Sequence, residues 1–236
     1  MGFYYEWGQN MGTTKESHYI YKFLRSDAES ISPLLSGSME EQEGIYKILT
    51  STPIESFFEC LMKMTSELPS LNSSQIPCFS NMEKGASRLN ELLLFSKNGL
   101  TFEQIGYQLI KAKSNCAKIK YGENQAKLAL MMSLVSFDKK RPIVVYPTAW
   151  GTYLTRFSFE EKKNVLKKLL LRNPCIQHIL CLAFHGVVSY QKVVSFLSKT
   201  SIVRRRTSVK YLITFILNDT ERKDILKNIE WKIEVD

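Results

Sequence analysis

Three consecutive arginines stand out as candidates for chemistry in this chain. They begin an apolar run, "TSIVRRRTSVKYLITFILND", which spans residues 200–219. On a helical wheel, one side of this run is apolar and faces a core. The opposite side carries Arg204, Thr207, Ser208 and Tyr211. Arg205 and Arg206 flank the apolar stripe, where their stems can lie on the protein while their charged groups reach outward.

These positions fit two kinds of contact with nucleic acid. An arginine that forms two hydrogen bonds with guanine contributes about 1–3 kcal/mol of base discrimination, which suits Arg204. Thr207, Ser208 and Tyr211 on the same side are predicted to contact bases with it. Arg205, Arg206 and Lys210 are placed to neutralise phosphates, which fixes register without reading sequence. The alternative is an ordinary solvated basic face, because a run of charge alone usually indicates solvated surface.

A second candidate reading helix lies in the stretch "GENQAKLALMMSLV", residues 122–135. The pattern predicts that Ala126, Met132 and Val135 are buried and that the polar residues at the start are exposed. The residues expected to be exposed are Gly122, Glu123, Asn124, Gln125 and Lys127. The amides of Asn124 and Gln125 can pair with adenine, and Lys127 can neutralise phosphate.

A β-hairpin is expected after this helix. "LVSF" and "IVVY" are β-prone runs joined by the five residues "DKKRP". The tip of the hairpin would carry Lys139, Lys140 and Arg141, which could contact backbone phosphate or the minor groove. The alternative is a helical domain with a polar hairpin that binds other proteins.

The elements around these residues predict a mainly α (α+β) fold. It consists of tandem winged-helix or helix-turn-helix units with a small hairpin wing, preceded by an N-terminal region. The loop at 68–81 separates residues 1–80 from a first unit at 81–157, and a second unit follows at 158–236.

Local signals place several helices of this fold. Thr101 and Gln104 have the spacing of a capping box at a helix start. Asn173 caps a helix with Pro174 at its first position, and that helix ends at Gly186. Two further helices, at 189–198 and from 201 onward, would meet at a short turn formed by Lys199 and Thr200.

Charge is distributed unevenly along the chain. The net charge is +9, but residues 1–100 hold 8 basic and 12 acidic side chains (−4), whereas residues 101–236 hold 24 and 11 (+13). Such asymmetry favours a polyanionic partner for the second half, although basic chains also occur without one. Five scattered cysteines, no secretion signal and no apolar stretch long enough to span a membrane predict a cytoplasmic protein.

No catalytic or metal site is predicted. Asp219, Asp224, Glu230 and Lys232 loosely match the acidic-plus-lysine signature of restriction nucleases. The alternation in "NIEWKIEVD" favours a half-buried strand instead, which could belong to a second wing. Cys175, His178, Cys181 and His185 are zinc-ligand types, but one continuous helix cannot wrap four ligands around an ion. A core face explains them better, and no cofactor is expected.

The order of several motifs resembles tandem winged-helix modules of bacterial restriction-modification and related defence proteins. These motifs are "LTFEQIG", "YGENQAKLALMMSLV", "VVYPTAWGTYL", "LLLRNPCIQHIL" and "TSIVRRRTSVKYLITFI". The resemblance covers residues 86–217, and its closing helix is matched by Thr200, Arg205, Arg206, Ser208 and Val209. The sequence departs from the pattern "LT..G" at 147–151, where Pro147 stands in place of Leu.

The resemblance implies DNA binding, as the targeting part of an endonuclease or as a regulator. Together with the charge, it predicts a double-stranded DNA-binding protein with some sequence preference. Residues 1–80 would form the contact surface for a homodimer, or for a nuclease or methyltransferase partner. The alternatives are a type II restriction endonuclease with an unrecognised metal-dependent centre and a protein-interaction scaffold.

Overall fold

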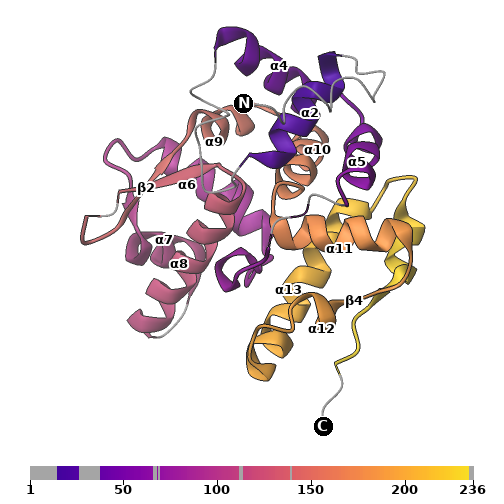
Figure 1. Cartoon of the computed structure of the whole chain (residues 1–236). Helices are drawn as coiled ribbons and strands as arrows, with labels where there is room; N and C mark the ends of the chain where they lie inside the picture. Colours follow the sequence, from indigo (N-terminus) through magenta and orange to yellow (C-terminus); the bar gives the residue numbers. More distant parts are fainter. Residues whose placement is uncertain are drawn as a thin grey trace.

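The protein is mainly helical with small sheets, as the sequence predicts. The computed structural model describes residues 15–26, 38–65, 68, 70–111, 114–138 and 140–233. Figure 1 shows the first two described helices at the top, the elements of residues 83–147 at the left and the C-terminal helices at the lower right. None of the described helices is both long and apolar enough to cross a membrane.

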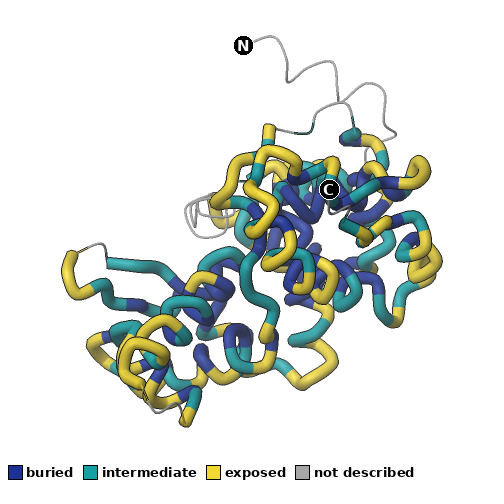
Figure 2. The backbone as a smooth tube through the Cα atoms, turned by 90° about the horizontal axis from the view of Figure 1, so that it is seen from below, coloured by how far each residue is buried: buried dark blue, intermediate teal, exposed yellow. Residues whose placement is uncertain are grey.

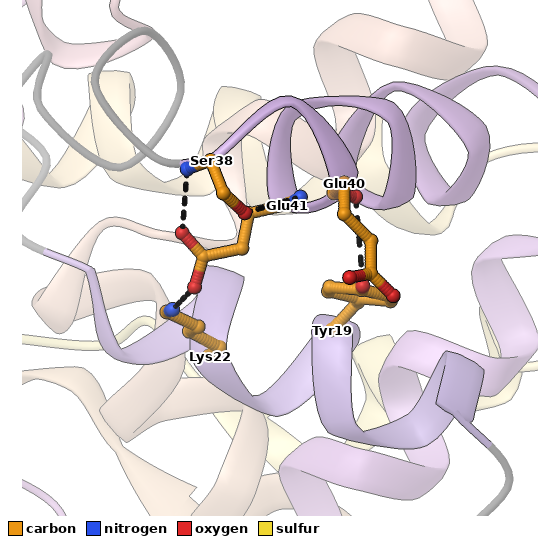
Figure 3. A network of polar contacts seen from close by, with 5 residues as sticks. All are labelled: Tyr19, Lys22, Ser38, Glu40 and Glu41. Atoms are coloured by element: carbon orange, nitrogen blue, oxygen red, sulfur yellow. Dashed lines mark hydrogen bonds and ion pairs between the residues drawn. The ribbon is translucent and has the colours of Figure 1, made fainter.

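The described N-terminal region contains the helices α2 (Lys15–Arg25), α4 (Met39–Thr50) and α5 (Ile54–Lys63). Helices α2 and α4 are joined by an ion pair between Lys22 and Glu41 (Figure 3). Glu41 also accepts a hydrogen bond from the backbone N–H of Ser38 at 3.1 Å, which closes the capping box of α4.

The next group of elements runs from residue 83 to 147. In chain order these are η3 (Glu83–Arg88), α6 (Leu89–Leu94), β1 (Leu100–Thr101), α7 (Phe102–Leu109), α8 (Asn115–Met131), β2 (Val135–Asp138) and β3 (Val144–Pro147). The strands form an antiparallel sheet in the order β1-β3-β2. The capping box predicted from Thr101 and Gln104 is confirmed at the start of α7. Helix α8 begins at Asn115, well before the predicted start at 122.

The predicted hairpin is confirmed in β2 and β3, which pair with Val135 opposite Pro147. Figure 2 shows it as an arm that extends from the body of the molecule, with exposed residues at its tip. The base of the arm is anchored where Val135 and Val145 are buried and where Phe137 packs edge-on against Phe102 at 5.5 Å.

Helices α7 and α8 cross at a pair of glycines. A Cβ atom at Gly106 would lie 1.9 Å from the carbonyl oxygen of Lys118, and one at Gly122 would lie 1.9 Å from the carbonyl oxygen of Phe102. These distances are far below van der Waals contact, so only glycine allows the two backbones to approach so closely. The crossing therefore sets the position of α8 relative to α7.

The rest of the chain forms a second set of elements. In chain order these are α9 (Ala149–Leu154), α10 (Phe159–Leu170), α11 (Pro174–His185), β4 (Val188–Ser189), α12 (Tyr190–Val193), α13 (Lys199–Leu217), η4 (Lys223–Asn228) and β5 (Ile229–Glu230). The predicted cap at Asn173, with Pro174 in first position and Gly186 after the end, is confirmed in α11.

Two predictions for this second set are wrong. Helix α12 ends at Val193, because residues 194–198 form turns and a bend, and Ser198 caps α13 so that Lys199 is already helical. The C-terminal strand β5 pairs with β4 in parallel, with Ile229 opposite Val188, so these two strands are not a hairpin wing.

Three cationic side chains are buried at the end of α10 and just after it. Lys167, Lys168 and Arg172 are each at most 3% exposed. Lys168 Nζ donates to the carbonyl oxygens of Ile48 at 3.2 Å and Leu49 at 2.7 Å, in the last turn of α4. A helix C-terminus presents free carbonyls and partial negative charge, which compensates a buried ammonium group.

Arg172 links the N-terminal helices to the end of α8. Its Nε donates to Ser26 Oγ at 2.9 Å and its Nη1 donates to Ser133 Oγ at 2.6 Å. Its guanidinium group lies over the ring of Phe23. The buried apolar residues of the N-terminal helices belong to the same core as those of the later helices. The predicted three-part division of the chain stays a prediction, but its parts share a core.

The glycine crossing gives a first prediction. Gly106→Ala or Gly122→Ala should lower the free energy of unfolding by about 1–3 kcal/mol or more, because the added methyl group overlaps backbone that must move. Gly186→Ala is the matched control, since nothing lies within 4 Å of the position of its Cβ. Urea unfolding measures all three, and equal stability of the Gly106 variant and the control would contradict the close crossing.

Buried Lys168 gives a second prediction. Burial lowers the pKa of Lys168 from 10.5 to about 8, although the charges of Glu55 and Glu16 act in the opposite direction. Above pH 8 the unfolded chain holds a proton at this lysine that the folded chain has released, so the free energy of unfolding rises with pH. The buried thiols of Cys175 and Cys181, whose pKa burial raises from 9.0 to about 12, oppose this rise above pH 9.

The free energy of unfolding should therefore increase by about 1 kcal/mol between about pH 7.5 and pH 9 through Lys168. Lys168→Met removes the titrating group and should remove this part of the increase. Urea unfolding of both proteins at the two pH values measures the difference. The same pH dependence in both proteins would show that Lys168 is not held in this environment.

Candidate nucleic-acid interface

A groove with a volume of about 690 Å³ lies between α8, α13 and the loop at 72–79, and we call it the α8–α13 groove. Helix α8 contributes Lys120, Asn124 and Lys127, and α13 contributes Arg204 and Arg205. Both helices lie in the lower half of the molecule in Figure 1. The two helices that the sequence identifies as candidate readers therefore contribute to one surface.

On α8, a carboxylate sits between two of the lysines. Glu123 accepts from Lys120 Nζ at 2.8 Å and from Lys127 Nζ at 2.6 Å. Burial raises the pKa of Glu123, but hydrogen bonds and charge from the two lysines outweigh this and hold the pKa below its usual value. The three side chains together carry one positive charge, so part of the cationic potential of α8 is already neutralised within the protein.

Two predicted exposed residues of α8 are buried. Gln125 is only 4% exposed, because its side chain points towards η3, where its Oε1 would lie 2.9 Å from a Cβ atom at Gly85. Gly122 is buried at the crossing with α7. A base-reading role for Gln125 is therefore wrong in this structure, since its amide is not accessible. Asn124 is half-buried and lines the groove, and Lys127 is exposed.

On α13, the exposed face agrees with the helical wheel except at one position. Arg204, Thr207, Lys210 and Tyr211 are exposed. Ser208 is 8% exposed and lies on the buried side beside Val209, so it cannot reach a base as predicted. Arg204, Thr207 and Tyr211 are therefore the accessible residues of α13 that were predicted to contact bases.

The other two arginines of the run bond to the protein's own backbone. Arg205 Nη1 donates to the carbonyl oxygens of Ser73 and, at 3.4 Å, Ile76. Arg206 Nη1 donates to the carbonyl oxygen of Trp231 at 3.3 Å. Both side chains are half-buried, so the prediction that they are outward-facing phosphate ligands is wrong in its geometry. Arg205 instead holds the loop at 72–79 against α13.

The hairpin tip supplies further exposed cations. Lys140 and Arg141 are exposed, as predicted, and Lys139 lies outside the described residues. The base of the hairpin reaches the α8–α13 groove, because Phe137 of β2 lines it. The same arm therefore contributes an aromatic ring to the groove and basic groups to its own tip.

Some residues that line the groove were not predicted as binding residues from the sequence. The loop at 72–79 is predicted only as a boundary, yet it forms one wall of the groove with Ile76, Pro77 and Phe79. Lys120 lies before the predicted helix and was not proposed as a contact. The continuing helical pattern of "NCAKIKY" upstream of residue 122 is the signal that could have placed Lys120 on the same helix face.

The alternative catalytic groups lie elsewhere. Asp219 pairs with Lys163 at 2.5 Å on the surface. Within the described ranges, no three His, Cys, Asp or Glu side chains lie close enough together to hold one metal ion. Cys181 Sγ donates to the carbonyl oxygen of Leu61 at 3.1 Å, and Cys175 is fully buried, which agrees with the core face predicted for the two cysteines. His178 is half-buried and His185 is exposed, so the prediction of a core position is wrong for His185.

Comparisons with protein-family models, with curated proteins and with solved structures find no match to this chain.

The different surroundings of the two neighbouring arginines give a third prediction. Arg205→Ala should lower the free energy of unfolding by about 1–3 kcal/mol, because two backbone carbonyls lose a charged donor. Arg204→Ala should change it by less than about 0.5 kcal/mol, because Arg204 is exposed. Urea unfolding of the two variants tests this. A larger loss at Arg204 than at Arg205 would contradict the assigned roles.

Proposed function

We propose that this protein binds double-stranded DNA through α8, α13 and the tip of the β2–β3 hairpin. The observation that carries the proposal is the α8–α13 groove, which brings cations from both candidate reading helices to one surface. The residues that line it, all within the described part of the chain, include no Asp or Glu. Glu123 beside the groove neutralises part of this charge, but the lining cations outnumber it, and a concave surface of net positive charge attracts a polyanion.

The order of elements supports the proposal as well. A helix, a short strand, two helices and an antiparallel hairpin, with the sheet order β1-β3-β2, are the parts of a winged helix, and we propose that residues 83–147 form one. In that arrangement α8 is the third helix, the one inserted into the major groove. We assign α13 the same role in a second helix-turn-helix unit, with α12 before it.

The structure reduces the predicted contact set to its accessible members. We propose that Asn124, Arg204, Thr207 and Tyr211 face base edges, whereas Lys127, Lys140, Arg141 and Lys210 contact phosphates. The biological setting, defence or transcriptional regulation, stays a prediction of the resemblance. The same holds for a partner bound through residues 1–80.

The fourth prediction concerns binding to DNA. Wild-type protein should bind a mixed-sequence duplex, and the logarithm of its affinity should fall linearly with the logarithm of the salt concentration, as phosphate neutralisation requires. Lys127→Ala should reduce the slope of log affinity against log salt concentration by about 1, which corresponds to one phosphate contact, and should weaken binding to all sequences alike. Arg204→Ala should cost about 1–3 kcal/mol on a selected site and less on random DNA. Fluorescence anisotropy across a salt series measures these effects.

Arg222→Ala is the matched control for Arg204→Ala. Arg222 is exposed and follows the C-terminal end of α13, at the opposite end from Arg204. Its removal lowers the net charge equally and should leave the affinity nearly unchanged. If wild type fails to bind duplex DNA at low salt, or if both arginine variants lose affinity equally, the proposed interface is wrong. Site-specific cutting of plasmid DNA with magnesium present would instead establish the endonuclease alternative.

A further inference from the structure

The α8–α13 groove has the dimensions and lining of a small-molecule site. Its volume of about 690 Å³ lies within the roughly 300–1,000 Å³ that is usual for such sites. Apolar and aromatic surface comes from Ile76, Phe79, Leu128 and Phe137, among others. A purely electrostatic phosphate surface would not need this apolar lining, so the groove is suited to a ligand with a flat apolar part and a negative charge.

Two buried polar atoms belong to residues that line this groove. Asn124 Oδ1 and Arg205 Nε are buried and have no hydrogen-bond partner among the described residues. Buried polar atoms are nearly always paired in folded proteins, and each exception requires an explanation. Asn124 Oδ1 is an acceptor that an N–H group of a ligand could satisfy, and Arg205 adds positive charge beside the groove.

We propose that the α8–α13 groove binds a nucleoside phosphate. The base lies against the aromatic surface of Phe79 and Phe137, and the amide of Asn124 accepts from an N–H group of the base. Lys127 and Arg204 bind the phosphate at the exposed side. The nucleotide comes either from solution or from an unpaired strand, since the two share this chemistry. The inference uses residues of the proposed DNA interface but does not require duplex binding.

Saturation-transfer NMR on the full chain tests the proposal. The probes are AMP, GMP, CMP and UMP, each at about 1 mM, where even weak binding is detectable, and an oligothymidylate of about 12 nucleotides. Two variants alter the groove: Phe79→Ala removes aromatic surface and Lys127→Gln removes a phosphate contact. Their matched controls are Phe196→Ala and Lys47→Gln, which change exposed residues that do not line the groove.

The expected result is binding of at least one probe, weakened about tenfold by each groove variant and by neither control. Comparable affinity of a mononucleotide and the oligonucleotide identifies a free nucleotide as the ligand, whereas much tighter binding of the oligonucleotide identifies an unpaired strand. Absence of binding by every probe, or binding that the controls weaken as much as the groove variants, overturns the proposal.

Duplex binding by the same protein preparations separates this proposal from the proposed function. Duplex binding without nucleotide binding overturns the nucleotide site alone. Nucleotide binding without duplex binding supports the site and overturns the duplex interface. Because Lys127→Gln alters an exposed side chain, its result stands even if Phe79→Ala, which changes a half-buried ring, reduces stability.

Discussion

The rest of the structure depends on the burial of three cations at the end of α10. A buried charge is costly unless hydrogen bonds and opposite partial charges compensate it. Here the compensation comes from distant parts of the chain. Lys168 donates a hydrogen bond to a carbonyl oxygen in the last turn of α4, and Lys167 donates to the carbonyl oxygen of Asn218 after α13. Arg172 donates to the hydroxyl groups of Ser26 and Ser133. These bonds require α4, α13 and the end of α8 to meet around α10.

The packing around these buried cations also positions the walls of the α8–α13 groove. Asn173, directly after Arg172, caps α11 and donates through Nδ2 to the carbonyl oxygen of Gln75 at 2.9 Å. Arg205 holds the same loop from α13. Hydrogen bonds from Asn173, at the start of α11, and from Arg205, on α13, therefore hold the loop at 72–79 in place. The loop wall of the groove is positioned by contacts with the core, whereas the exposed side chains of Lys120, Lys127 and Arg204 complete the lining.

Local chemistry made much of the fold predictable from sequence. Thr101 with Gln104, and Asn173 with Pro174, determine helix starts through bonds within a few residues, and both were confirmed. The β-prone runs around residues 139–142 likewise predicted the hairpin. The errors arise from contacts between distant residues. Gln125 is buried against η3, and Lys167 and Lys168 look like surface lysines until the carbonyls that receive them are known.

The candidate site was predictable to a similar extent. Asn124, Lys127 and Arg204 were chosen from helix periodicity and residue type, and all three line one groove. No local pattern indicates that α8 and α13 face a common space, because that depends on packing around α10. For the same reason Arg205 was predicted as a phosphate ligand. Its actual partners, the carbonyl oxygens of Ser73 and Ile76, lie far away in sequence.

The central claim is that α8 and α13 form one nucleic-acid surface. Amide hydrogen–deuterium exchange of the full chain, with and without a DNA duplex, tests it most directly. The account predicts slower exchange in peptides covering residues 114–127 and 199–211 together, with exchange in α2 and α4 unchanged. No change in either helix, or protection confined to the N-terminal helices, would contradict it.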